Sequence, residues 1–218
     1  MRVIGFNGSP RKKWNTAILL ERALEGASSQ GAETELIHLY DLRYQGCRSC
    51  FACKTRGGQS YGRCAAKDDL TPILAEVERA DGIVLGSPIY YGTVSGEAKS
   101  FLERLAFPYW TYTEPPQSLF PRKIQTGLIY TMNVSEDQMR ENNYGVHFGV
   151  NERVLRIVFG ASESLCSYNT FQFDDYSKVV ATRFDPVKKA QRRADVFPKD
   201  CEKAFEMGVR IARGSANP

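Results

Sequence analysis

Hydrogen-bond donors cluster in a short loop that follows the first apolar run of the chain, Val3–Phe6. The loop contains a Gly-Ser-Pro-Arg turn, and the apolar pattern of a helix begins just after it. A strand, a tight loop and a helix N-terminus form an anion site, because unpaired N–H groups and the helix dipole point at the loop. The spacing fits neither Gly-x-Gly-x-x-Gly nor a P-loop, so it favours a terminal phosphate, although an ordinary capped turn would also explain this stretch. The side chains that could donate to a phosphate are Ser9, Arg11, Asn15 and Thr16.

A second loop with unusual chemistry runs from Ser87 to Gly96, directly after the apolar run 83–85. Pro88 fixes a turn, Tyr90 and Tyr91 offer flat aromatic faces, and Gly92 allows close approach of the backbone. This combination suits a planar, amide-rich ring, whereas a tyrosine pair by itself is more often an ordinary core or surface feature. Ser95 is placed to cap the helix that follows.

Four cysteines lie in a glycine-rich segment, at Cys47, Cys50, Cys53 and Cys64. The first three have the Cys-x-x-Cys-x-x-Cys spacing of half a bacterial ferredoxin motif, and the fourth could complete the set of ligands for an iron–sulfur cluster. Zinc is a weaker alternative, since structural zinc sites usually pair two Cys-x-x-Cys units. Free or redox-active thiols are a third alternative, because nearby basic residues favour the thiolate. All three stay open, and no residue is assigned outright to a metal.

Strands and helices alternate along the chain. The apolar runs predict strands at 3–6, 33–39, 82–86, 127–131 and 164–173. Helices are expected at 15–31, from Asp68 or Asp69 through 77, after Ser95, around 150–159, from Pro186, and over 201–212. This alternation predicts an α/β protein with a five-stranded parallel sheet between two layers of helices. In the order 2-1-3-4-5 the first and third strands are neighbours, so the loops that follow them should meet.

The length of 218 residues fits a single domain over 1–218, with two elaborated loops. These loops are the cysteine-rich segment 45–67 and an aromatic, proline-rich segment 106–124. A hydrophobic fraction of 42%, with no long apolar run and no block of basic residues, predicts a cytoplasmic protein that binds neither membrane nor nucleic acid.

Three motifs together resemble the NADPH-dependent FMN reductase branch of the flavodoxin-like superfamily. They are Asn-Gly-Ser-Pro-Arg-Lys with Asn-Thr at 15–16, Gly-Ser-Pro-Ile-Tyr-Tyr-Gly at 86–92, and Ser-Gly-Glu-x-Lys-x-Phe-Leu-Glu-Arg at 95–104. The resemblance covers about the first 135 residues and implies a flavodoxin-like three-layer α/β/α sandwich that binds FMN as a homodimer or homotetramer. It implies a phosphate site at Ser9, Arg11, Asn15 and Thr16. The implied contacts of the rest of the flavin are Pro88, Ile89, Tyr90, Tyr91, Gly92, Ser95, Thr131, Met132 and Asn133.

The cysteine segment resembles that of the iron–sulfur flavoproteins, but ten residues separate Cys53 from Cys64, more than in that family. We therefore expect an FMN-dependent oxidoreductase that takes electrons from NAD(P)H and reduces a quinone, a flavin or another small acceptor. No catalytic residue is assigned, because the flavin carries the chemistry. An electron-transfer protein of the iron–sulfur flavoprotein type is the first alternative, and a flavodoxin-like binding or regulatory module is the second.

Overall fold

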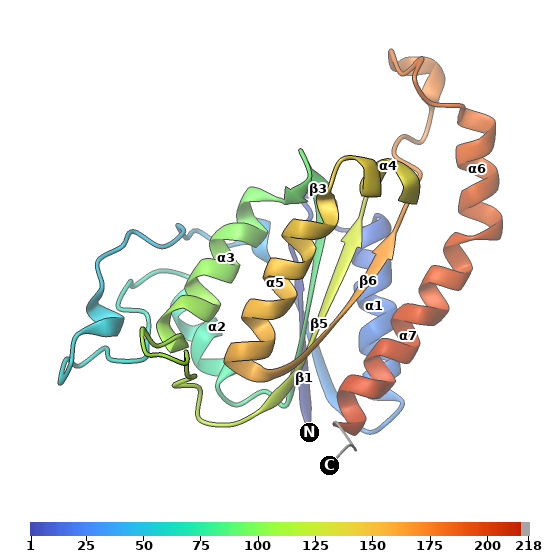
Figure 1. The fold of residues 1–218 in the computed structure, drawn as a ribbon. Coiled ribbons are helices and arrows are strands. Elements are labelled where there is room, and N and C mark those ends of the chain that lie inside the picture. Colours follow the sequence, from blue (N-terminus) through green and yellow to red (C-terminus); the bar gives the residue numbers. More distant parts are fainter. Residues whose placement is uncertain (215–218) are drawn as a thin grey trace.

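The structure, a computed structural model, describes residues 1–214 and has one central sheet with helices on both faces (Figure 1). The parallel strands are β1 (Arg2–Asn7), β2 (Glu33–His38), β3 (Gly82–Tyr90), β5 (Ile124–Thr131) and β6 (Gly160–Ser167). Their order is β2-β1-β3-β5-β6, so the predicted flavodoxin-like class is confirmed and the five parallel strands follow 2-1-3-4-5 in chain order. The sheet differs from the prediction by a sixth strand, the two-residue β4 (Thr93–Val94), which is antiparallel to β3.

Two separate cores hold the layers together, one on each face of the sheet. Along β3, Ile83 and Leu85 pack into one core, and Val84 between them packs into the other. This alternation explains why the central strands are continuous apolar runs, since side chains on both faces are buried.

Helices α1 (Asn15–Ser28) and α7 (Phe197–Arg213) cover one face of the sheet. The other face is covered by α2 (Leu70–Val77), α3 (Gly96–Ala106) and α5 (Tyr144–Phe159). Helices α4 (Glu136–Glu141) and α6 (Pro186–Asp195) lie near the upper edge, where the parallel strands end (Figure 1). Short 3₁₀ helices lie in the connections at Leu39–Asp41, Ala52–Lys54, Phe107–Tyr109 and Tyr176–Lys178.

Glycine lets α1 and α7 pack backbone against backbone. A Cβ atom at Gly208 would lie 1.7 Å from the carbonyl oxygen of Ala23, and one at Gly26 would lie 2.0 Å from that of Phe205. Neither position tolerates a side chain without separating the helices, because interiors are close-packed and such overlap cannot be absorbed by rotamer changes.

The last strand corrects one prediction. It was expected at 164–173, but β6 spans Gly160–Ser167 and the chain then leaves the sheet. Asn169 has a positive φ of 51°, and the Thr170 N–H and hydroxyl both donate to the Met132 carbonyl, so the segment folds across the end of β5. The alternation of side chains thus continues beyond the hydrogen-bonded strand.

Helix starts were predicted with mixed success. Ser95 caps α3 and Asp185 caps α6, as expected. Before α2, the Asp69 side chain makes no cap bond, and the Asp68 carboxylate accepts the Leu70 N–H instead. The helix expected around 150–159 begins six residues earlier, at Tyr144. Helix α4 was missed, although the Ser-x-x-Gln pattern of its capping box was readable in the sequence.

Within residues 1–214, no helix combines the length and the apolar character needed to cross a bilayer.

Candidate functional site

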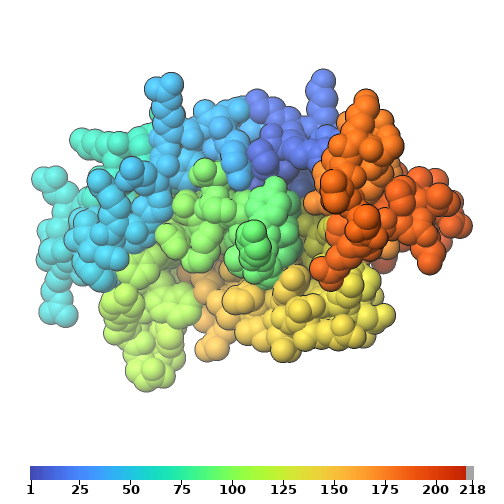
Figure 2. Space-filling model, turned by 90° about the horizontal axis from the view of Figure 1, so that it is seen from above, coloured from blue at the N-terminus to red at the C-terminus, as the bar shows by residue number. Residues whose placement is uncertain are grey.

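The two loops that follow β1 and β3 are in direct contact, as predicted. The Gly8 N–H donates to the Gly86 carbonyl at 2.8 Å, and the Ser95 hydroxyl donates to the Gly8 carbonyl at 2.6 Å. Both loops reach the surface at the upper edge of the sheet (Figure 2). The Ser95 side chain is fully buried and also accepts the Ala98 N–H, so its role in the structure is to join the loops and start α3.

The first loop leaves the N-terminus of α1 without a capping side chain. Trp14 occupies the N-cap position with no side-chain bond to the helix, and the first turn contains no acidic residue. The buried Ser9 hydroxyl organises the loop by accepting the Arg11 N–H at 3.1 Å. The helix dipole and the N–H groups of the first turn therefore face the loop without a capping carboxylate, which is the arrangement that binds anions.

Two donor side chains of this loop, Arg11 and Asn15, are held by backbone carbonyls from the C-terminal third of the chain. The Arg11 guanidinium stacks on the Trp14 ring, 3.3 Å from its centroid, and donates to the Gln172 carbonyl at 2.7 Å. The Asn15 amide donates to the Phe171 carbonyl at 2.8 Å. Thr16 is buried, and its hydroxyl lies 2.7 Å from that of Thr131 at the end of β5. Desolvation lowers the pKa of Arg11, although it stays cationic.

A two-residue hairpin turn presents the two tyrosines. Tyr90 pairs with Thr93 across β3 and β4, so Tyr91 and Gly92 form the turn. Their φ angles are 50° and 84°, the pattern of a type I′ turn, for which glycine is preferred at the second position. A Cβ at Gly92 would also approach the Tyr144 ring to 3.0 Å.

Tyr91 is fully exposed, and Tyr90 is also exposed. The positive φ of Tyr91 is strained for an aromatic residue. Tyr91 is not buried either, so neither packing nor backbone conformation explains a tyrosine at this position. Pro88 and Ile89 lie just below, partly buried, and complete the hairpin stem with the tyrosines. The hairpin therefore holds aromatic surface beside the first loop.

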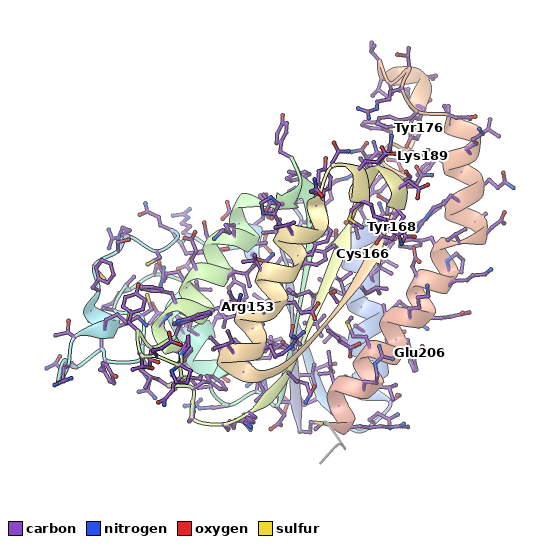
Figure 3. The ribbon with its side chains drawn as sticks, in the orientation of Figure 1. Arg153, Cys166, Tyr168, Tyr176, Lys189 and Glu206 are labelled. Carbon is purple, nitrogen blue, oxygen red and sulfur yellow. The ribbon has the colours of Figure 1, made fainter. Side chains whose placement is uncertain are left out.

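The end of β5 forms the third wall of the site. Thr131 and Met132 are buried, and Asn133 is partly exposed. Lys189 reaches in from α6 (Figure 3). Its ammonium group donates to the carbonyl oxygen of Asn133 at 2.9 Å and also to the side-chain oxygen of Asn133. Lys189 is 3% exposed, and desolvation lowers its pKa to about 8, with the neighbouring Arg192 contributing in the same direction.

The sequence analysis missed the contribution of α6 to this site. Besides Lys189, Arg193 donates to the Asn15 side-chain oxygen at 2.8 Å. Helix α6 was predicted from Pro186, but none of its residues was predicted to belong to the site. Contacts across 178 residues leave no local pattern, so the sequence offered no signal for them.

The four cysteines line a cavity of about 300 Å³ beside the C-terminal half of α3. Glu103, Arg104, Phe107 and Pro108 form part of its wall, and the loop side is formed by Cys47, Cys50, Cys53, Cys64 and neighbouring residues. Cys53 is buried, and burial raises the pKa of its thiol. Within residues 1–214, no three of the His, Cys, Asp and Glu side chains are placed to bind one metal ion.

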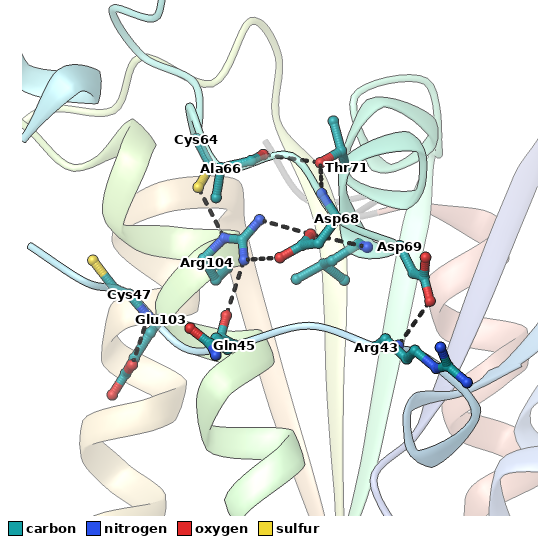
Figure 4. A network of polar contacts seen from close by, with 11 residues as sticks. Arg43, Gln45, Cys47, Cys64, Ala66, Asp68, Asp69, Thr71, Glu103 and Arg104 are labelled. Carbon is teal, nitrogen blue, oxygen red and sulfur yellow. Dashed lines mark hydrogen bonds and ion pairs between the residues drawn. The ribbon is translucent and has the colours of Figure 1, made fainter. Parts of the chain in front are cut away.

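Arg104 ties the cysteine loop to α3 and α2 through a network of polar contacts (Figure 4). Its side chain is 2% exposed and donates to Asp68 at 2.8 and 3.1 Å, to the Gln45 carbonyl at 2.9 Å, and to the Cys64 sulfur at 2.8 Å. The hydrogen bond from Arg104 holds the pKa of the Asp68 carboxyl below its usual range. The Cys47 N–H donates to Glu103 at 3.2 Å, so two cysteines are fixed by α3.

The aromatic segment 106–124 packs on the cysteine loop and not on the first site. The Lys54 ammonium donates to the backbone carbonyls of Phe107, Pro108 and Trp110, and Phe51 lies edge-on to Phe107. Tyr109 of this segment is buried in the core, where its ring contacts Phe120 and Phe159.

The fold is that of a flavodoxin-like protein, and its two contacting loops lie at the upper edge of the sheet. A family model described as NADPH-dependent FMN reductase matches residues 1–129, and the chain belongs to this family. An iron–sulfur flavoprotein from Methanocaldococcus jannaschii is 42% identical over 104 residues, which are 48% of this chain and 51% of the relative. One from Archaeoglobus fulgidus is 39% identical over 104 residues, 48% of each chain. The chain thus spans about half the length of the curated relatives it matches.

Solved structures of similar fold cover nearly the whole chain. An NAD(P)H:quinone oxidoreductase from Methanothermobacter marburgensis has a TM-score of 0.70 at 15% identity, covering 96% of this chain and 98% of its own. An FMN-dependent NADH-azoreductase from Bacillus anthracis, solved with FMN, has a TM-score of 0.64 at 13% identity, covering 97% of this chain and all of its own. At these identities the likeness concerns the fold.

Proposed function

We propose that the protein is an FMN-dependent oxidoreductase that uses NAD(P)H to reduce a small acceptor such as a quinone or a flavin. The observation that carries the proposal is the contact between the two loops. It places an uncapped helix N-terminus with a cationic loop beside an exposed aromatic hairpin, in a chain of the FMN reductase family. When bound, FMN would take a hydride from NAD(P)H and return two electrons, with protons, to the acceptor.

The residues present fit this cofactor. Ser9, Arg11, Asn15 and Thr16 would hold the phosphate through the loop and the start of α1. The hairpin residues Pro88, Ile89, Tyr90, Tyr91 and Gly92 would flank the ring, with Thr131, Met132 and Asn133 on the side of β5. Ser95 would support the site indirectly, because its hydroxyl joins the two loops by a hydrogen bond to the Gly8 carbonyl. The Tyr91 side chain is fully exposed, so a nicotinamide or an acceptor could reach its aromatic ring from solvent.

The test is to add FMN to the purified protein, remove the excess, and record the visible spectrum. Bound flavin, followed by oxidation of NADPH or NADH that depends on an added quinone or free flavin, is the expected result. Changing Arg11→Ala together with Ser9→Ala should weaken FMN binding by about tenfold or more, because charge-assisted bonds are lost. Failure of the protein to bind FMN at all would refute the proposal.

The cysteine cavity favours a second candidate, an electron-transfer protein of the iron–sulfur type. One cavity is lined by Cys47, Cys50, Cys53 and Cys64, and Arg48 and Arg104 supply positive charge to its wall. No single ion fits the described ligands, but in a cubane cluster each thiolate binds a different iron, so the sulfurs stand farther apart. Four thiols at one cavity would bind the four irons of such a cluster, which would supply one-electron transfer.

Iron and acid-labile sulfide, measured on anaerobically purified protein, test this second candidate. About four irons per chain would support it, and Cys50→Ser should then release the cluster while FMN binding persists. If the protein contained flavin but no iron, even after reconstitution under reducing conditions, this second candidate would be refuted and only the reductase proposal would remain.

We further propose that the protein forms a homodimer or homotetramer and works in the cytoplasm. The exposed hairpin and the exposed valines of α5, Val146 and Val150, offer apolar surface that a second copy would cover. All six cysteines are free thiols, which suits a reducing compartment.

A further inference from the structure

Lys189 and Arg193 lie near the phosphate loop without a carboxylate partner within residues 1–214, and Arg11 interacts at longer range with Asp174. Arg11, Lys189 and Arg193 take part in none of the ion pairs found within residues 1–214, whereas their neighbours Lys12 and Arg192 pair with Asp41 and Asp200. Lys189 is buried and the two arginines are partly buried. A desolvated charge is costly unless an opposite charge accompanies it, so this arrangement calls for an anion.

Arg193 is the member of this group that lies on the start of α1. Its guanidinium donates to the Asn15 side-chain oxygen at 2.8 Å and stacks on the Phe197 ring, 4.0 Å from the centroid. Asn15 is the first residue of α1, so the guanidinium stands beside the positive end of the helix dipole. The Arg193 guanidinium and the positive N-terminal end of α1 repel each other unless a negative group lies between them.

We infer that Arg193 is a phosphate-recognition residue of the flavin site, which positions Asn15 and adds a cation beside the phosphate loop. This inference rests on the proposed function and extends it to a part of the chain outside the family match at 1–129. Its chemical consequence is selectivity for a flavin that carries a terminal phosphate. Arg193 should therefore discriminate between FMN and riboflavin, which share the ring and the ribityl chain.

The experiment is an equilibrium titration of the full-length protein with FMN and with riboflavin, followed by flavin fluorescence. Arg193→Ala should raise the Kd for FMN about tenfold or more and change the Kd for riboflavin less than about twofold. Arg193→Lys should recover part of the loss, because it keeps the charge without the planar fork. Lys188→Ala is the matched control, since Lys188 is exposed on the same helix, and it should leave both affinities unchanged.

The outcomes separate the inference from the function on which it rests. Equal weakening of both flavins by Arg193→Ala, or an unchanged affinity for FMN, would overturn the role of Arg193 while the flavin site stands. If Arg193→Ala does not fold, Arg193→Gln gives the same comparison, because it keeps a donor for Asn15 and removes the charge. Wild-type protein that binds neither flavin would refute the proposed function instead.

Discussion

The Arg104 network makes a specific prediction about stability. Arg104→Met removes a guanidinium that is almost fully buried, and it leaves the Asp68 carboxylate and the Gln45 carbonyl without their donor. Breaking a buried ion pair by removing one partner costs about 3–5 kcal/mol. The Asp68 side chain is 20% exposed and can be partly rehydrated, so we expect the lower end of that range, about 3 kcal/mol.

The assay is urea unfolding followed by circular dichroism, at pH 7 and again near pH 3. Lys99→Met is the matched control on the same helix, because it removes an exposed ion pair with Glu103 that should be worth less than about 0.5 kcal/mol. The Asp68 pKa is lowered in the folded state, so its contribution is present above its unfolded pKa of about 3.9 and is lost as pH falls through the folded value. The difference between wild type and Arg104→Met should therefore shrink at the lower pH. An Arg104→Met variant no less stable than the control would refute this reasoning.

Three further predictions concern the core, the hairpin and α6. Gly208→Ala should destabilise the protein by about 3 kcal/mol or more, because its Cβ would overlap the Ala23 carbonyl, while Gly149→Ala on α5, with open space around the added Cβ, should cost nothing; denaturant midpoints compare the two. Tyr91→Asn should stabilise the hairpin by about 1 kcal/mol, since asparagine tolerates the positive φ, and should weaken FMN binding; a lower unfolding midpoint would contradict the turn assignment. Lys189 has a pKa of about 8 in the fold and about 10.5 when unfolded, so the unfolded state binds more protons between these values and wild type should gain stability over Lys189→Met above pH 8. The difference in unfolding free energy between the two proteins, measured by denaturation at pH 8 and pH 9, should increase by up to about 1.4 kcal/mol per pH unit. If the unfolding free energies of both proteins changed equally with pH, a buried charge at this position would be contradicted.

The central part of the fold was predictable because its signals are local. The run Ile83–Leu85 is apolar at every position, as a strand covered on both faces must be, and Ser95 and Asp185 mark helix starts by residue type. The end of β6 was mispredicted because the alternation of side chains continues after the hydrogen bonds to β5 end. The positive φ of Asn169, where the chain turns away, could not be predicted from the residue type.

The candidate site was predictable where one loop supplies the residues and not where distant segments meet. The loops at 9–16 and 87–96 were found from residue type and spacing, but the hairpin within the second loop was not predicted. The partners of Arg11 and Asn15 lie more than 150 residues away, at Gln172, Phe171 and Arg193. The segment that follows β6 and the packing of α6 against α7 bring them there. The cysteine spacing indicated a set of ligands, but the cavity that they share is built by α3.

The contact between the start of α1 and the end of α6 also has a consequence for synthesis on the ribosome. Asn15 leaves the ribosome 178 residues before Arg193. At about 5–20 residues per second, this separation corresponds to roughly 10–35 s of translation. Throughout that interval the nascent chain contains β1 and the phosphate loop that follows it, but it lacks the Arg193 side chain that contacts Asn15. The complete binding site therefore forms only after α6 has been synthesised, and nascent chains that stop before α6 should compete poorly for the cofactor.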